Sequence, residues 1–297
     1  MNSSDTRRWW QPGPFEYSSS TMLLMRLGFA MLIFWSTEWG TGKLTTQDNP
    51  NGIAHFVDLT WLGHHPPGWG IKGLCIGGLL MYVVGFLPVL GLLPMLFFSI
   101  CIGTLNLSQG EIQHSWQLVT LIGLAQFAAY AALGRAALRP SRDVQRLAAY
   151  WGTVTIAGGY VTCGLVKMVA TKGLWIWKTP LLSVQLLKSN WAAYYNWLKK
   201  PPHWLEQFTQ FLVDHPWFTR AFFGTGLVLE LFAFTVLISR RWSFWFGLAL
   251  VSLHVGISFV MGLKFPEHNA AIAIFLILPN AIAALRRGPA KNAAALP

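Results

Sequence analysis

Charged residues are scarce in this chain of 297 residues: only 11% are Asp, Glu, Lys or Arg, whereas 54% are hydrophobic. This apolar share exceeds that of a soluble domain, and the apolar residues occur in blocks longer than a core helix needs. The low charge content therefore argues against a soluble globular protein. It indicates an all-α, multi-pass membrane protein.

Cysteine is also rare, and no pair has the Cys-x-x-Cys spacing. Cys75, Cys101 and Cys163 all fall inside apolar stretches, where small packing roles are more common than redox or metal roles. Acidic residues number only 11 against 22 Lys and Arg, which gives a net charge of +11. No nucleic-acid recognition motif accompanies these basic residues, which lie at the boundaries of the apolar stretches, so we expect membrane lipids rather than nucleic acid as partners.

Stretches of about 17 to 25 apolar residues are long enough to cross a bilayer as helices. The sequence has eight of them: 21–39, 71–87, 89–105, 114–134, 147–170, 221–239, 242–263 and 269–285. The second and third meet at Pro88 and form either a tight hairpin or one long broken element. Because Arg26 interrupts the first stretch, which lacks a small-residue cleavage pattern, we expect it to remain as a span rather than a cleaved signal. These stretches predict a transmembrane domain over residues 21–285, between an N-terminal segment (1–20) and a basic tail (286–297).

Arginine clusters indicate the orientation of the spans. Arg7 and Arg8, four arginines between 135 and 146, the pair Arg240 and Arg241, and the C-terminal tail all fall on one side if eight spans alternate. Short loops rich in Lys and Arg stay in the cytoplasm. We therefore expect both termini to be cytoplasmic in a cell membrane, which we take to be a bacterial inner membrane.

The same alternation leaves the long loop 171–220 on the non-cytoplasmic side. Apolar and aromatic residues recur at helical spacing over 181–198, before Pro201 and Pro202, and again over 204–212, before Pro216. This pattern predicts two amphipathic helices at the membrane interface. They serve either as a surface anchor or as a lid over a site that opens outward.

Six ionisable residues lie within or against the spans, where an isolated charge costs roughly 2.5 to 3.5 kcal/mol. They are candidates for a functional site because each needs a partner, water or a ligand: Arg26, Glu38, His114, Lys167, Glu230 and His254. Lys167 either snorkels to the outer interface or faces inward as a base. Glu230 and His254 are expected to face a common interior with Lys167, with Glu230 paired to one of the other two.

Four segments resemble conserved stretches of one family. Residues 113–118 (QHSWQL) are similar to the asparagine-histidine-serine-tyrosine-leucine stretch of vitamin K-dependent γ-glutamyl carboxylase and its bacterial relatives, the horizontally transferred transmembrane (HTTM) domain proteins. Residues 164–175 (GLVKMVATKGLW) resemble that family's glycine, lysine and tryptophan pattern around the proposed catalytic base, and residues 25–35 resemble its first helix. Between Glu230 and Pro266, an acidic residue, a serine-arginine pair, a mid-helix histidine and a Gly-x-x-Phe-Pro turn follow the order of its last conserved block.

This resemblance implies a helix bundle whose site opens to the non-cytoplasmic side. In the carboxylase, the lysine matching Lys167 is thought to deprotonate vitamin K hydroquinone, and the histidine matching His114 acts in the carboxylation step. The resemblance therefore implies catalytic roles for Lys167 and His114. We expect Glu230, His254 and Trp175 to bind a lipophilic ligand, for which a quinone is the candidate cofactor.

Departures from the family pattern limit this transfer. Val166 precedes Lys167 where the carboxylase has a second lysine, Trp116 replaces the motif tyrosine, and no extramembrane domain follows Pro297. Carboxylation of a protein substrate is therefore not expected, and whether the chain is an enzyme stays open. There are two alternative functions. The first is a non-catalytic accessory subunit of the DoxX type, although such proteins usually have about half as many spans. The second is a factor that modifies or exports a secreted peptide.

Labelling of single cysteines tests the orientation. In a cysteine-free background, cysteines that replace Asn51 and Asn190 should react with an impermeant thiol reagent added to intact cells, whereas cysteines that replace Arg139 and Arg241 should react only after the membrane is opened. Labelling of position 139 from outside would overturn the topology.

Overall fold

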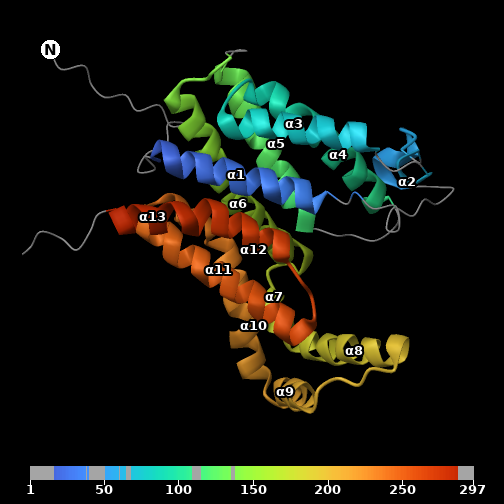
Figure 1. Ribbon diagram of the computed structural model, residues 1–297. Coiled ribbons are helices and arrows are strands. Elements are labelled where there is room, and N and C mark those ends of the chain that lie inside the picture. Colours follow the sequence, from blue (N-terminus) through green and yellow to red (C-terminus); the bar gives the residue numbers. More distant parts are fainter. Residues whose placement is uncertain are drawn as a thin grey trace, which may run out of the picture.

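The described part of the computed structural model comprises residues 17–37, 39, 51–59, 61–64, 68–108, 115–134 and 138–286. These residues form helices and turns without any strand, and most of the long helices lie side by side in a bundle (Figure 1). Within these ranges, six helical segments are long and apolar enough to cross a membrane: α1 (Ser19–Ser36), α4 (Pro88–Leu107), α5 (Ser115–Gly134), α6 (Arg142–Ala170), α11 (Arg240–Met261) and the segment Pro266–Leu285. The prediction of an all-helical fold is therefore confirmed over the described residues, and six helical segments have the length and composition of membrane spans.

Two of the predicted spans are shorter than the others. α3 (Trp69–Val84) has 16 residues, and α10 (Pro216–Leu231) also has 16 before it continues as the 3₁₀ helix η3 (Ala233–Leu237). The last apolar segment is irregular as well, because a π-helical stretch, η4 (Ala273–Ile277), separates α12 (Pro266–Ile272) from α13 (Leu278–Arg286). Two of the eight predicted segments therefore contain a change of helix type.

The chain turns sharply at Pro88, so α3 and α4 form a hairpin rather than one broken helix. Gly85 ends α3 with a φ of 72°, Leu87 has a φ of 43°, and Pro88 occupies the first turn of α4. The two helices touch through their backbones: a Cβ atom on Gly78 would lie 2.5 Å from the carbonyl oxygen of Gly91. Glycine at this crossing is therefore required by the packing of the hairpin.

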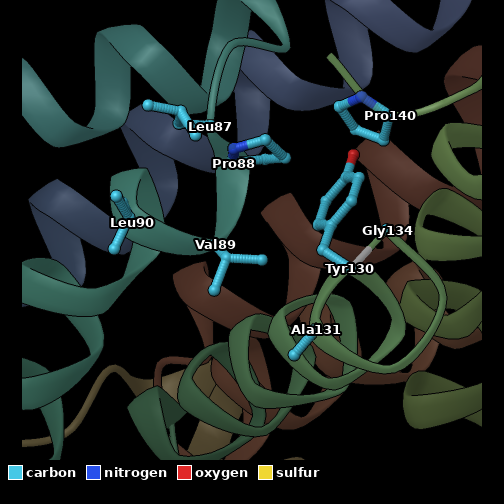
Figure 2. A pocket seen from close by; sticks show the side chains of 8 residues that line it. All are labelled: Leu87, Pro88, Val89, Leu90, Tyr130, Ala131, Gly134 and Pro140. Atoms are coloured by element: carbon cyan, nitrogen blue, oxygen red, sulfur yellow. The ribbon is translucent and has the colours of Figure 1, made fainter. Parts of the chain in front are cut away.

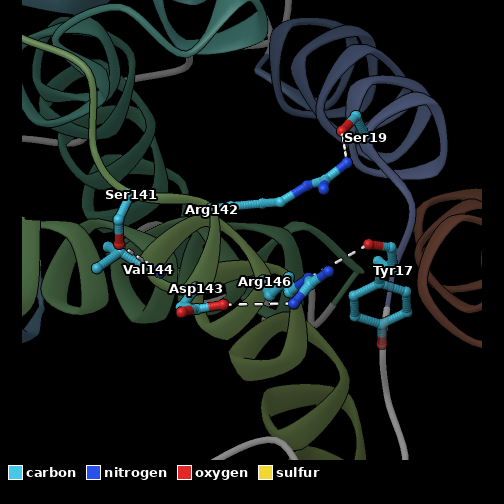
Figure 3. A network of polar contacts seen from close by, with 7 residues as sticks. All are labelled: Tyr17, Ser19, Ser141, Arg142, Asp143, Val144 and Arg146. Carbon is cyan, nitrogen blue, oxygen red and sulfur yellow. Dashed lines mark hydrogen bonds and ion pairs between the residues drawn. The ribbon is translucent and has the colours of Figure 1, made fainter.

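Three arginines from two of the predicted clusters meet at one end of the bundle, as predicted, whereas Arg7, Arg8 and residues 287–297 lie outside the described residues. Arg142 donates a hydrogen bond to Ser19, and Arg146 donates to the Tyr17 carbonyl and pairs with Asp143 at 3.3 Å (Figure 3). The Arg240 guanidinium lies 5.9 Å from the centre of the Tyr17 ring. The start of α1 and the end of α13 lie at this same end (Figure 1).

The opposite end carries α7 (Trp175–Lys178), α8 (Pro180–Trp197) and α9 (His203–Asp214), together with the short helices η2 (Gly52–His55) and α2 (Trp61–His64). The two helices predicted for the loop 171–220 are present, and each ends shortly before the expected prolines. Leu186 of α8 and Leu212 of α9 pack on Val260 of α11 in a small cluster of their own. α8 and α9 therefore lie beside the end of α11, off the main bundle (Figure 1).

Neighbouring glycines in α3 provide a test of the hairpin. Gly78→Ala should lower the free energy of unfolding by about 1–3 kcal/mol, because the added methyl group collides with the backbone of α4. Gly77→Ala is the matched control, since a Cβ atom there has no neighbour within 4 Å. Thermal unfolding in mild detergent measures both, and equal melting temperatures would contradict the tight crossing.

Candidate functional site

An ion pair joins α6 to α10 near the end of the bundle opposite the arginines. The Lys167 ammonium donates hydrogen bonds to both carboxylate oxygens of Glu230, with 2.6 Å between Nζ and Oε2. The side chain of Glu230 is 11% exposed and that of Lys167 is 33% exposed. Lys167 therefore faces a partner rather than simply extending to the interface, and the predicted partner of Glu230 is confirmed as Lys167.

The local backbone explains why these two side chains meet. Glu230 is the penultimate residue of α10, where a carboxylate is disfavoured by the negative end of the helix dipole, so a cation there is stabilising. Gly164 lies one turn before Lys167 on α6, and a Cβ atom on it would lie 3.1 Å from the backbone nitrogen of Leu231. The missing side chain allows α6 and α10 to approach closely enough for a direct ion pair.

Trp175 completes this cluster. Lys172 and Gly173 both have positive φ values, of 55° and 79°, and the resulting turn returns the chain toward the end of α6. The Lys167 ammonium consequently lies 5.4 Å from the centre of the Trp175 ring, within range of a cation–π interaction. The structure thus brings together three of the predicted site residues: Lys167, Glu230 and Trp175.

His254 has a different partner from the one considered for it. Its Nε2 atom forms a 3.0 Å hydrogen bond with the Tyr160 hydroxyl, and its ring packs 5.0 Å from Phe265 and 5.3 Å from His268. His254 and Glu230 are both buried, as expected, but the alternative in which they pair directly is wrong because each already has another partner. The imidazole also lies beside the Asn269 amide, although neither Nδ1 nor the Asn269 Oδ1 atom makes a hydrogen bond of good geometry.

The two polar pairs lie on one face of α6. Tyr160, Gly164 and Lys167 are spaced i, i+4 and i+7, so they share a stripe along the helix, and Tyr160 lies about 10 Å from Lys167 along its axis. The helical spacing could have identified Tyr160 from the sequence. The contact of His268 with His254 could not be predicted from helical spacing, because the position of His268 depends on the turn between α11 and α12.

Three of the predicted residues remain. His114 and Glu38 fall outside the described residues. Arg26 is buried at the arginine-rich end, where its Nη1 atom donates a 2.9 Å hydrogen bond to Gln145 and it also bonds Tyr130. No carboxylate among the residues that the structure describes pairs with it, so neutral groups hold its charge.

An apolar cavity of about 320 Å³ also lies near this end, between the α3–α4 turn and α5, with Tyr130, Pro88 and Pro140 in its wall (Figure 2). Lys167 is 25 residues beyond Arg142 on α6, about 37 Å along the helix, so this cavity is separate from the ion pair.

The ion pair offers acid–base chemistry, because an amine and a carboxylate in contact can exchange a proton. The described residues contain no group of three or more His, Cys, Asp or Glu placed to hold a metal. The geometry defines a helical bundle with six helices suited to cross a membrane and a partly buried ion pair near one end. The chain matches no protein-family model, no curated protein and no solved structure with which it was compared. The likeness to the HTTM and carboxylase family therefore stays a prediction.

Double-mutant cycles distinguish the observed pairs from the rejected one. Lys167→Met and Glu230→Gln should each destabilise the protein, and the double variant should lose less than the sum by about 0.5–3 kcal/mol, because the first change already leaves the partner unpaired. The control cycle combines Glu230→Gln with His254→Leu and should be additive within about 0.5 kcal/mol. Additivity in the first cycle, measured by equilibrium unfolding in detergent, would show that the ion pair contributes no coupling energy.

Proposed function

We propose that this protein binds a lipophilic small molecule, with a quinone as the leading candidate, beside Lys167, Glu230 and Trp175, and transfers a proton to or from it. The observation that carries the proposal is the ion pair, which combines a nearly buried carboxylate with a lysine that stays one-third exposed beneath an aromatic ring. Partial exposure lowers the desolvation cost of the Lys167 ammonium and also leaves it accessible to a ligand, which complete burial would prevent.

The proposal includes eight spans with the arginine-rich end in the cytoplasm. α3 is about 24 Å long at 1.5 Å per residue, and a bilayer thins slightly around a short span. α10 and η3 together supply 16 and 5 residues, which cover about 34 Å. With this count the ion pair lies toward the non-cytoplasmic side, where a ligand could enter from the outer leaflet.

Proton transfer within the pair gives the site its chemistry. When the Lys167 proton moves to Glu230, a neutral amine and a neutral acid replace two opposite charges, and that state is tolerated in apolar surroundings. The free amine can then take a proton from an acidic hydroxyl or an activated C–H group of the ligand. The ligand becomes an anion, and the ammonium that has formed neutralises it.

The Trp175 ring and the neighbouring apolar side chains favour a flat, weakly polar ligand over a strongly hydrated one. The resemblance adds His114 as a second catalytic group. The catalytic role of His114 stays a prediction. The location in a bacterial inner membrane and the secreted peptide as a partner are predictions as well.

The competing function is a non-catalytic membrane component of the DoxX type, in which the ion pair only holds α6 against α10. The bidentate geometry of the pair is also consistent with this role. Binding of a ligand separates the two functions, because a purely structural pair needs none.

Co-purification tests the binding step. The full chain, purified in mild detergent, should carry a lipophilic compound that mass spectrometry of the organic extract detects. Lys167→Met should lose most of it, whereas Lys188→Met, on the exposed surface of α8, should retain it. Equal recovery from the wild-type protein and Lys167→Met, or no compound in any preparation, would favour the structural role.

A deuterium-exchange assay tests the base. In D₂O the wild-type protein should exchange an acidic carbon-bound proton of the identified compound, whereas Lys167→Arg should bind the compound yet exchange nothing, since arginine keeps its proton in a protein. Exchange by Lys167→Arg at the wild-type rate would exclude Lys167 as the base.

A further inference from the structure

A groove of about 500 Å³ lies where α11 ends and α12 begins, and it is separate from the ion pair. One wall is apolar and is formed by Val255 and Phe259 of α11, which are 56% and 65% exposed. Trp204 of α9 extends this wall, because its ring stacks on Phe259 with 4.5 Å between the ring centres. The wall therefore presents a surface suited to a hydrocarbon chain.

The other side of the groove is polar. Lys264, in the turn after α11, is exposed and forms no ion pair with any residue in the described ranges. Asn269 also lines the groove, and on its buried side its side-chain amide lies beside the His254 imidazole. Lys264 and Asn269 therefore give the groove one charged and one polar lining residue.

The depth of the groove matches that of lipid head groups. It lies at the end of the bundle that carries α7, α8 and α9, whose aromatic side chains include Trp177, Trp191 and Trp204. Tryptophan gathers at membrane–water interfaces, and a lysine at that level attracts anionic head groups. Lys264 and Asn269 therefore lie where the head group of a lipid would be, and the apolar wall lies where its acyl chain would be.

We propose that this groove binds a single phospholipid whose head group is anionic, as in phosphatidylglycerol. The phosphate pairs with Lys264, the polar head group lies beside Asn269, and the acyl chain lies along Val255 and Phe259. A zwitterionic head group fits less well because it brings a second cation to Lys264. A free phosphate leaves the apolar wall unused.

Binding of short-chain lipids tests this site in the purified full chain. In uncharged detergent, dihexanoyl-phosphatidylglycerol below its micellar concentration should bind more tightly than dihexanoyl-phosphatidylcholine and more tightly than glycerol phosphate, as measured by native mass spectrometry. Lys264→Gln should weaken the binding of dihexanoyl-phosphatidylglycerol about tenfold, the effect expected from losing one hydrogen bond between charged groups. Lys178→Gln, on exposed α7, is the matched control and should leave the affinity unchanged.

Each contrary result overturns a defined part of the proposal. Equal affinity for the two lipids would exclude recognition of charge, and equal affinity for glycerol phosphate would make the ligand a soluble anion. Equal losses in Lys264→Gln and Lys178→Gln would reduce the effect to the general surface charge. None of these results depends on Lys167 or on the compound that co-purifies with it, so this proposal and the proposed function can fail separately.

Discussion

The high cost of an unpaired charge in apolar surroundings governs the arrangement of this bundle. Lys167 and Glu230 meet because neither side chain could stay charged alone at its depth. Arg26 meets the same constraint differently, through the neutral side chains of Gln145 and Tyr130. His254 accepts or donates a single hydrogen bond with Tyr160. These three interactions connect α6 to α10, α1 and α11. α6 is therefore the helix that all three polar interactions share.

Close backbone contact is what makes these polar pairs possible. Gly164 lets α10 approach α6, and Gly78 with Gly91 does the same for the α3–α4 hairpin. In a membrane, where lipid tails are as apolar as a leucine side chain, such contacts supply dispersion energy that burial alone does not. Glycine in these helices therefore determines where the polar groups can meet, although it carries no chemistry of its own.

Much of the fold follows from local sequence properties, which is why it could be predicted. The length of the apolar stretches, the turn at Pro88 and the prolines after α8 and α9 all act on neighbouring residues. The pairing of Glu230 could be narrowed only to two candidates, because the sequence gives the depth of a residue but not the direction in which its side chain points. The groove beside Asn269 could not be predicted at all, since it depends on how the turn after α11 and the aromatic residues of α9 come together.

The helix changes from α to 3₁₀ shortly after Glu230, and this change determines which side chains of α10 and η3 face the core. Glu230, Ala233 and Val236 are all buried, at a constant spacing of three residues. In an α-helix each step of three residues would rotate the side chain by about 60°, so Val236 would point about 120° away from Glu230. In a 3₁₀ helix residues three apart are eclipsed, so Ala233 and Val236 of η3 lie in one row on the buried side. η3 begins three residues after Glu230, and its packing therefore holds the end of α10 in place. A change at Ala233 or Val236 would act on the ion pair without contacting it.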